Sequence, residues 1–159
     1  MSIVVFVNPG SRANRRDPDH ARRFALILGE TGHVLTPASS DALAAEARQV
    51  AEAQPSIIGV HGGDGTLHWT VTALVRAYGE RPLPPLALLP GGTMNVVASS
   101  LGILAQPEAL LAQLVAEEKA ARDLLAKQLL QQARHWPLLQ RSRRRGALFV
   151  RRGHHHFGL

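Results

Sequence analysis

The stretch His61-Gly62-Gly63-Asp64-Gly65-Thr66 decides how this chain folds. It follows a short apolar run at residues 57–60 and precedes apolar residues with helical spacing from Leu67 to Val75. This pattern predicts a strand, a glycine turn and the N-terminus of a helix. Glycines let a backbone approach a phosphate closely, and a helix N-terminus offers it free N–H groups. A glycine-rich turn that binds nothing is the alternative interpretation.

Asp64, in the middle of this stretch, makes it more than a turn. A carboxylate beside a phosphate cradle repels the phosphate, unless it holds a metal ion or takes a proton from an attacking hydroxyl. The sequence therefore predicts phosphate chemistry here and gives Asp64 a candidate catalytic role.

Strands and helices alternate on both sides of this stretch. Short apolar runs predict strands, and the segments between them have helix caps and helical spacing. The predicted strands are residues 3–7, 33–36, 56–60 and 86–89, and the predicted helices are residues 17–30, 42–53, 67–78, 93–100 and 107–133, the first of them opened by Asp17-Pro18. This order is typical of an α/β fold, a Rossmann-like parallel sheet covered by helices.

Each predicted strand is followed by small or hydrogen-bonding residues. The carboxyl ends of parallel strands meet at one edge of the sheet, which is where such sheets bind ligands. These residues are Asn8, Pro9, Gly10 and Ser11 after the first strand, Thr36 after the second, Gly62–Thr66 after the third, and Gly92, Thr93 and Asn95 after the fourth. One junction alone is ordinary turn chemistry, but four on one edge favour a nucleotide site.

Composition narrows the class of protein. The chain has 159 residues, 45% of them hydrophobic, which is enough for one domain with a core of its own. It has no cysteine, which excludes disulfides and thiolate catalysis. It also has no apolar run as long as the roughly 18 residues of a membrane span. Residues 1–7 have no basic leader, so we expect a cytoplasmic protein that can reach a membrane only at its surface.

The net charge of +6 is carried by the end of the chain. Residues 127–159 hold eight basic residues and no acidic one, which leaves −2 on residues 1–126. We expect no nucleic-acid partner for the domain itself, because its own charge is slightly negative.

The junction motifs resemble the catalytic domain family of diacylglycerol kinases and sphingosine kinases, which includes bacterial lipid kinases. The resemblance covers about residues 1–105. It rests on Asn8-Pro9, on Gly62-Gly63-Asp64-Gly65-Thr66 and on Pro90-Gly91-Gly92-Thr93-Met94-Asn95. The glycine motif alone is shared with NAD kinases, but the other two elements favour the lipid kinases.

The resemblance implies a kinase that uses ATP with Mg²⁺ and transfers the γ-phosphate to a lipid hydroxyl. Asp64 would be the catalytic carboxylate. The nucleotide-binding residues would be Asn8, Pro9, Gly10, Ser11, Thr36, Gly62–Thr66, Gly92, Thr93 and Asn95. Three positions depart from the family pattern: Arg12 stands where a glycine is usual, and His68 and Trp69 stand where Asn-Glu is usual.

The resemblance also implies a second, β-rich domain that this chain is too short to contain. We therefore expect a nucleotide-binding domain at residues 1–133, interpreted as truncated after it, and a disordered basic tail at residues 134–159. An out-of-frame sequence and a patch for anionic lipid or nucleic acid are the alternatives for the tail. The leucines after residue 123 would lack a partner within the domain and leave a homo-oligomer open.

Three functions follow as hypotheses. The first is a lipid-kinase-like protein, either active or only able to bind nucleotide. The second is an NAD-kinase-like enzyme that phosphorylates a ribose hydroxyl with the same glycine motif. The third is a non-enzymatic module that binds a nucleotide or an anionic surface.

Overall fold

The structure of the chain is a computed structural model that describes residues 2–149, with side chains described for residues 2–129. Two compact units are present, Met1–Lys119 and Ala120–Leu159. In chain order the elements are β1 (Ile3–Val7), α1 (Arg12–Arg16), α2 (His20–Leu28), the 3₁₀ turn η1 (Gly29–Thr31), β2 (Gly32–Leu35), α3 (Ser40–Ala53), β3 (Ile57–Gly62), α4 (Asp64–Tyr78), β4 (Leu86–Pro90), α5 (Val96–Ser100) and α6 (Pro107–Phe149).

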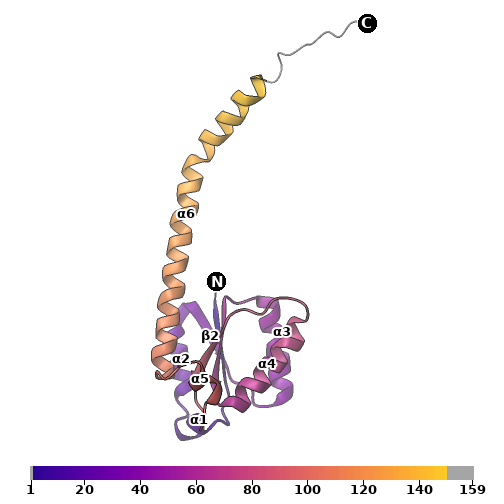
Figure 1. Cartoon of the computed structure of the whole chain (residues 1–159), viewed down its shortest axis with the longest axis vertical. Helices are drawn as coiled ribbons and strands as arrows, with labels where there is room; N and C mark the ends of the chain where they lie inside the picture. Colours follow the sequence, from indigo (N-terminus) through magenta and orange to yellow (C-terminus); the bar gives the residue numbers. More distant parts are fainter. Residues whose placement is uncertain (1, 150–159) are drawn as a thin grey trace, which may run out of the picture. The chain divides into compact units, whose positions relative to one another are not determined.

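The four strands form one parallel sheet in the order β2-β1-β3-β4. Helices α3 and α4 lie together on one side of it (Figure 1). The register places Val7 of β1 beside His61 of β3, and Gly62 beside Pro90 of β4. All four strands therefore end at the same edge, which confirms the predicted parallel α/β fold.

Alternate residues of β1 enter two separate cores, one on each face of the sheet. On one face Ile3, Val5 and Val7 pack with Phe24 of α2 and Leu111 of α6. The other face brings α3 and α4 against the sheet, and its core consists of Val4, Phe6, Ala47, Val50, Ala51, Ile58, Leu74 and Tyr78. Because both faces are covered, the strands are continuous apolar runs, as parallel sheets require.

The first helix begins earlier than the sequence predicted. Ser11 is the N-cap of α1, and its hydroxyl oxygen accepts a hydrogen bond from the Asn14 N–H. Asp17 follows the end of α1, and its carboxylate forms an ion pair of 2.7 Å with Arg23. The prediction that Asp17-Pro18 opens the helix was therefore wrong. Two cap signals stood six residues apart, and the earlier one starts a helix of its own.

Several other element ends differ from the prediction by one to three residues, and two of them bear on the site. β3 continues to Gly62, so His61 lies within a strand rather than in the glycine turn. α5 begins at Val96 rather than at Thr93, because Asn95 adopts the left-handed conformation with φ of 48°. A residue in that conformation cannot belong to a right-handed helix.

α6 begins at Pro107 as predicted, but its backbone continues to Phe149 rather than ending near residue 133. Leucine, glutamine, alanine and arginine dominate this stretch, and all four favour helices. Leu124, Leu125 and Leu129 are exposed, in line with the expectation that the leucines after residue 123 lack a partner within the domain. The predicted boundary at residues 133 and 134 stays a prediction, and residues 150–159 of the predicted tail lie outside the described part of the chain.

No helix within residues 2–149 combines the length and the apolar character that a membrane span needs.

Candidate functional site

Backbone hydrogen bonds join the loops after β1 and β4 to the end of β3, and α1 to the loop after β4. The Asn8 N–H donates to the His61 carbonyl at 3.2 Å, and the Gly91 N–H donates to the Gly62 carbonyl at 2.9 Å. The Ala13 N–H donates to the Gly91 carbonyl at 3.2 Å. Three of the four predicted junctions therefore form one connected site.

Asn8 joins the first junction to the glycine motif. Its side-chain oxygen accepts from the Gly10 N–H at 2.8 Å, which shapes the turn after β1. Its side-chain nitrogen donates to the Thr66 hydroxyl at 2.8 Å. Asn8 thus fixes the distance between the first loop and the first turn of α4.

The two glycine loops touch each other where a side chain could not fit. A Cβ atom built on Gly92 would lie 2.3 Å from Cα of Gly63, which is backbone and cannot move aside. Asn95 holds the second loop in this position, because its side-chain oxygen accepts from the Gly92 N–H at 2.8 Å. The paired glycines are therefore required by the close approach of the two loops.

His61 is fully buried behind these loops. Its Nδ1 donates to the Leu89 carbonyl at 3.0 Å, and its Nε2 lies 3.1 Å from Oδ1 of Asn14. The Phe24 ring packs edge-on against it at 4.8 Å between ring centres. Burial lowers the pKa of His61 to about 4, so the imidazole is neutral at physiological pH. His61 therefore supports the loops of the site from within the fold and does not line the surface that would face a ligand.

Asp64 is turned toward α5. Its two carboxylate oxygens accept from the N–H groups of Val96 and Val97 at 3.0 and 3.1 Å. These backbone hydrogen bonds lower the pKa of Asp64, because they stabilise the charged form. The carboxylate therefore caps the N-terminus of α5 and ties the two glycine loops together from the outside.

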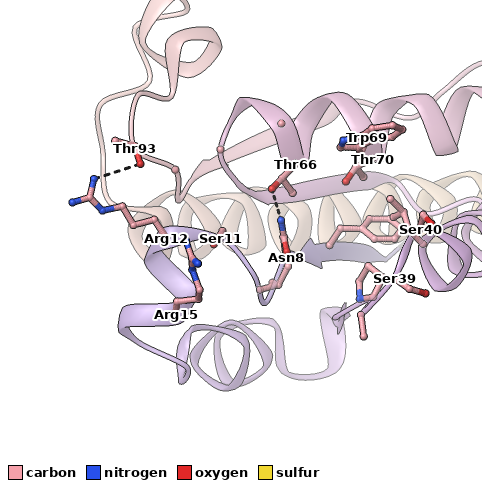
Figure 2. Close-up of a pocket in the computed structure, with 18 residues that line it drawn as sticks. Asn8, Ser11, Arg12, Arg15, Ser39, Ser40, Thr66, Trp69, Thr70 and Thr93 are labelled. Atoms are coloured by element: carbon pink, nitrogen blue, oxygen red, sulfur yellow. Dashed lines mark hydrogen bonds between the residues drawn. The ribbon is translucent and has the colours of Figure 1, made fainter.

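The main cleft has a volume of about 780 Å³ and opens along this edge of the sheet (Figure 2). Seven of the predicted site residues line it: Asn8, Ser11, Gly63, Gly65, Thr66, Gly92 and Thr93. Gly62, Asp64 and Asn95 instead line a small neighbouring hollow, and Pro9 and Thr36 line a third cavity. Gly10 lies on the exposed turn after β1 and lines none of these three cavities.

Arg12 and Arg15 also line the cleft, and sequence reasoning did not assign them to it. The Arg12 guanidinium donates to the Thr93 hydroxyl at 3.5 Å (Figure 2). Within residues 2–129 neither arginine forms an ion pair with a carboxylate. Both follow the Ser11 cap on α1, and recognising that cap would have placed them at the site.

A second missed group lies at the other end of the cleft. Figure 2 shows Trp69 and Thr70 of α4 near Ser39 and Ser40 at the start of α3, with Asn8 and Thr66 between them and the arginine end. Trp69 and Thr70 stand three and four residues after Thr66, so helical spacing brings them to the same face of α4. That spacing was the available signal.

No metal cage is present in the part of the chain whose side chains are described. No cluster of three or more histidine, aspartate or glutamate side chains could hold an ion there. Asp64 is the carboxylate of the glycine motif, and both of its oxygens already accept from N–H groups. The described residues therefore form no Mg²⁺ site by themselves, and we derive no step through the metal.

The open parallel sheet, its connected glycine loops and its arginine-lined cleft define the class of α/β domains that bind ligands at the carboxyl edge of the sheet. Residues 2–127 match the family of the diacylglycerol kinase catalytic domain. The chain belongs to this family.

Individual relatives agree with the family. The chain is similar to the probable lipid kinase YegS of Escherichia coli O1:K1 / APEC and to that of Escherichia coli strain K12 / DH10B, each 40% identical over 96 residues. These matches cover 56% of this chain and 29% of either relative, so the chain spans less than a third of their length.

The fold is also found in solved structures. A diacylglycerol kinase from Bacillus anthracis str. Sterne superimposes with a TM-score of 0.55 at 23% identity, over 73% of this chain and 42% of that one. A second structure, of a protein from the same strain described as a putative diacylglycerol kinase, gives a TM-score of 0.53 at 22% identity, over 73% of this chain and 42% of that one. At this identity the likeness supports the fold alone.

Proposed function

We propose that this chain is the nucleotide-binding part of an ATP-dependent lipid kinase, which transfers the γ-phosphate of ATP to a lipid hydroxyl at a membrane surface. The observation that carries the proposal is a cleft of about 780 Å³ whose glycine-lined end holds two arginines with no acidic partner among residues 2–129. The volume is in the usual range for small-molecule sites. Membership of the diacylglycerol kinase catalytic family supports the same reaction class.

The triphosphate belongs at the arginine end. Gly63, Gly65 and Gly92 expose backbone there without side chains, and α4 begins at Asp64 with N–H groups that lack intrahelical partners. Arg12 and Arg15 supply the positive charge that a triphosphate needs. Ser11 and Thr93 add hydroxyl groups to the same end, and Thr66 adds one in the middle of the cleft.

Asp64 would act on the acceptor. Its lowered pKa keeps it ionised at neutral pH, so it can accept a hydrogen bond from the attacking hydroxyl and orient it. In the transfer, the hydroxyl oxygen bonds to the γ-phosphorus while the bond from that phosphorus to the β–γ bridging oxygen breaks. ADP leaves with the electron pair, and the hydroxyl proton passes to the carboxylate.

Titration calorimetry with ATP and with tripolyphosphate tests the phosphate end. We expect both to bind, and the double substitution Arg12→Gln with Arg15→Gln to weaken both by about tenfold or more, as charged hydrogen bonds predict. Arg48→Gln is the matched control, because Arg48 is exposed on α3 and does not line the cleft. Absence of heat from the unsubstituted protein with either ligand would contradict the proposal.

A panel of acceptors separates the lipid kinase from the NAD-kinase-like alternative. Diacylglycerol, a sphingoid base and NAD are each incubated with labelled ATP and the protein. Label in a lipid supports the proposal, and label in NAD alone contradicts it. Asp64→Asn should lose any transfer that the unsubstituted protein shows, and calorimetry with ATP measures how far the lost contact to α5 also weakens binding.

A further inference from the structure

The two ends of the main cleft differ in chemistry. The arginine end is charged and glycine-lined, as described above. The opposite end is lined by apolar groups from β1, the β2–α3 loop, α3 and α4: Phe6, Pro37, Ala38, Leu43 and Trp69. Because both ends belong to one cavity, a ligand whose phosphates lie at the first end places its remaining atoms toward the second.

Trp69 is the largest side chain of this apolar end and is 63% exposed. It stands on α4, one turn beyond Thr66. The ring of His68 packs edge-on against the indole, with 5.6 Å between ring centres and an angle of 72° between the planes. A tilted ring pair of this kind steadies an exposed side chain. The indole is therefore supported by its own helix while much of its surface stays open.

The wall across from α4 offers both apolar surface and a hydroxyl donor. Leu43 and the Pro37-Ala38 segment give it apolar surface. Ser39 caps α3, because its oxygen accepts from the Ala42 N–H at 3.1 Å, and this leaves the hydroxyl hydrogen available to donate. A flat ring with nitrogen acceptors at its edge suits such a slot.

We infer that the apolar end of the cleft is a stacking site for the base of the nucleotide, with Trp69 as its aromatic platform. The inference rests on the proposed function, which places the phosphates at the arginine end of the same cavity. Aromatic side chains stack against the faces of nucleic-acid bases. This stacking depends little on which base is bound, because every base has a π-face like that of the indole. Trp69 thus makes the site select a nucleotide over a bare polyphosphate.

The cleft distinguishes Trp69 from the other exposed apolar side chains. Leu26, Met94 and Leu104 are each more than 70% exposed, and none of them lines the cleft. Scattered exposed apolar residues are normal on protein surfaces. Trp69 differs because it shares a cavity with the glycine loops and the two arginines.

Tryptophan fluorescence with calorimetry tests the inference. The sequence has two tryptophans, so Trp136→Phe leaves Trp69 as the single reporter. In this background we expect ATP to quench the emission, with a midpoint equal to the calorimetric Kd, and tripolyphosphate to bind without quenching. Trp69→Ala should weaken ATP about tenfold and leave tripolyphosphate unchanged, whereas Trp69→Phe should keep most of the ATP affinity. Val75→Ala, on an exposed part of the same helix, is the control and should change neither.

The outcomes separate this inference from the proposed function. Heat with neither ATP nor tripolyphosphate overturns both. Heat with both ligands, and equal ATP affinity in Trp69→Ala, overturns the stacking site alone. An equal loss for ATP and tripolyphosphate in Trp69→Ala also overturns it, because the side chain then supports the fold of the site. Quenching by phosphatidylglycerol vesicles but not by ATP overturns it as well and assigns Trp69 to a lipid surface.

Discussion

The two glycine loops look alike in sequence but are held in different ways. The loop after β3 leads into α4, a helix of 15 residues, and is backed by the buried His61. The loop after β4 leads into α5, a helix of five residues, by way of the left-handed Asn95. α5 has no side-chain cap of its own, and Asp64 of the first loop supplies the acceptors instead.

This difference shows that the first loop holds its own position, whereas the position of the second loop depends on its contacts with the first. The second loop keeps its shape through Gly92 against Gly63, Asp64 against α5, and the side chain of Asn95. A short exposed helix has little stability by itself, because helix nucleation is costly. Changes at the contacts between the loops should therefore disturb the second loop first, and changes behind the first loop should disturb both.

Gly92→Ala should have the largest effect. The new Cβ meets the Gly63 backbone at 2.3 Å, and backbone on both sides cannot yield. We expect a loss of unfolding free energy near the upper end of the range for overpacking, about 3 kcal/mol. Urea unfolding followed by circular dichroism measures it.

Gly65→Ala is the control for this prediction. No atom lies within 4 Å of a Cβ built on Gly65, which stands in the first turn of α4. Stability should rise by up to about 1 kcal/mol through helix propensity, while ATP binding weakens because Gly65 lines the cleft. Equal destabilisation by the two alanines would show that the loops are not in contact.

Acidification should lower the free energy of unfolding through His61, which lies behind the first glycine loop. Its folded pKa of about 4 lies below its usual value of 6.5, so the unfolded chain binds the proton more readily. Stability is complete above the unfolded value and falls as the pH drops toward the folded one. Between pH 7 and pH 5 we expect a loss on the order of 2 kcal/mol in urea unfolding. His20, Glu108 and Arg23 are the charged or titratable groups that act on His61.

His61→Gln removes this titration and should flatten the pH dependence over the same interval, even if its stability at pH 7 is lower. A slope unchanged by the substitution would show that His61 titrates alike in the folded and unfolded chains. The first glycine loop would then have no buried neutral histidine behind it.

Asp64→Asn should have a smaller effect, which is present at neutral pH and shrinks as the pH falls. The folded pKa of Asp64 is depressed, so its contribution is present above the usual value of 3.8 and is lost as the pH falls through the folded value. We expect the melting temperature of the unsubstituted protein to drop more steeply between pH 5 and pH 3 than that of Asp64→Asn. Parallel melting curves would mean that the carboxylate does not hold α5 in solution.

The sheet was predictable from the sequence because its signals are local. Strands such as Ile3–Val7 are continuous apolar runs, and α3 begins directly after Ser39, a residue type that favours helix caps. The errors arose where two local signals competed. Ser11 and Asp17 both suit a helix cap, and the glycines after His61 mark a turn that begins two residues later than the pattern indicates.

The site was predictable only in part, because its decisive contacts join distant segments. The glycine motif and Asn8 were found from their order along the chain. Nothing local shows that Asp64 bonds to the N–H groups of Val96 and Val97, 32 and 33 residues away. Arg12 and Trp69 likewise share a cleft only because α1 and α4 flank the same sheet edge.

Asn95→Gly should have the smallest effect, because two contributions cancel. Glycine relieves the left-handed backbone by about 1 kcal/mol, and losing the two hydrogen bonds between the Asn95 side chain and the Gly92 backbone costs about as much. Gln54 is the matched position, with the same φ of 48° at the end of α3. No side-chain hydrogen bond of Gln54 is found within residues 2–129, so Gln54→Gly should raise stability by about 1 kcal/mol in urea unfolding. An equal gain at both positions would mean that the Asn95 side chain does not hold the second loop, and the dependence of that loop on its partners would then rest on Asp64 and Gly92 alone.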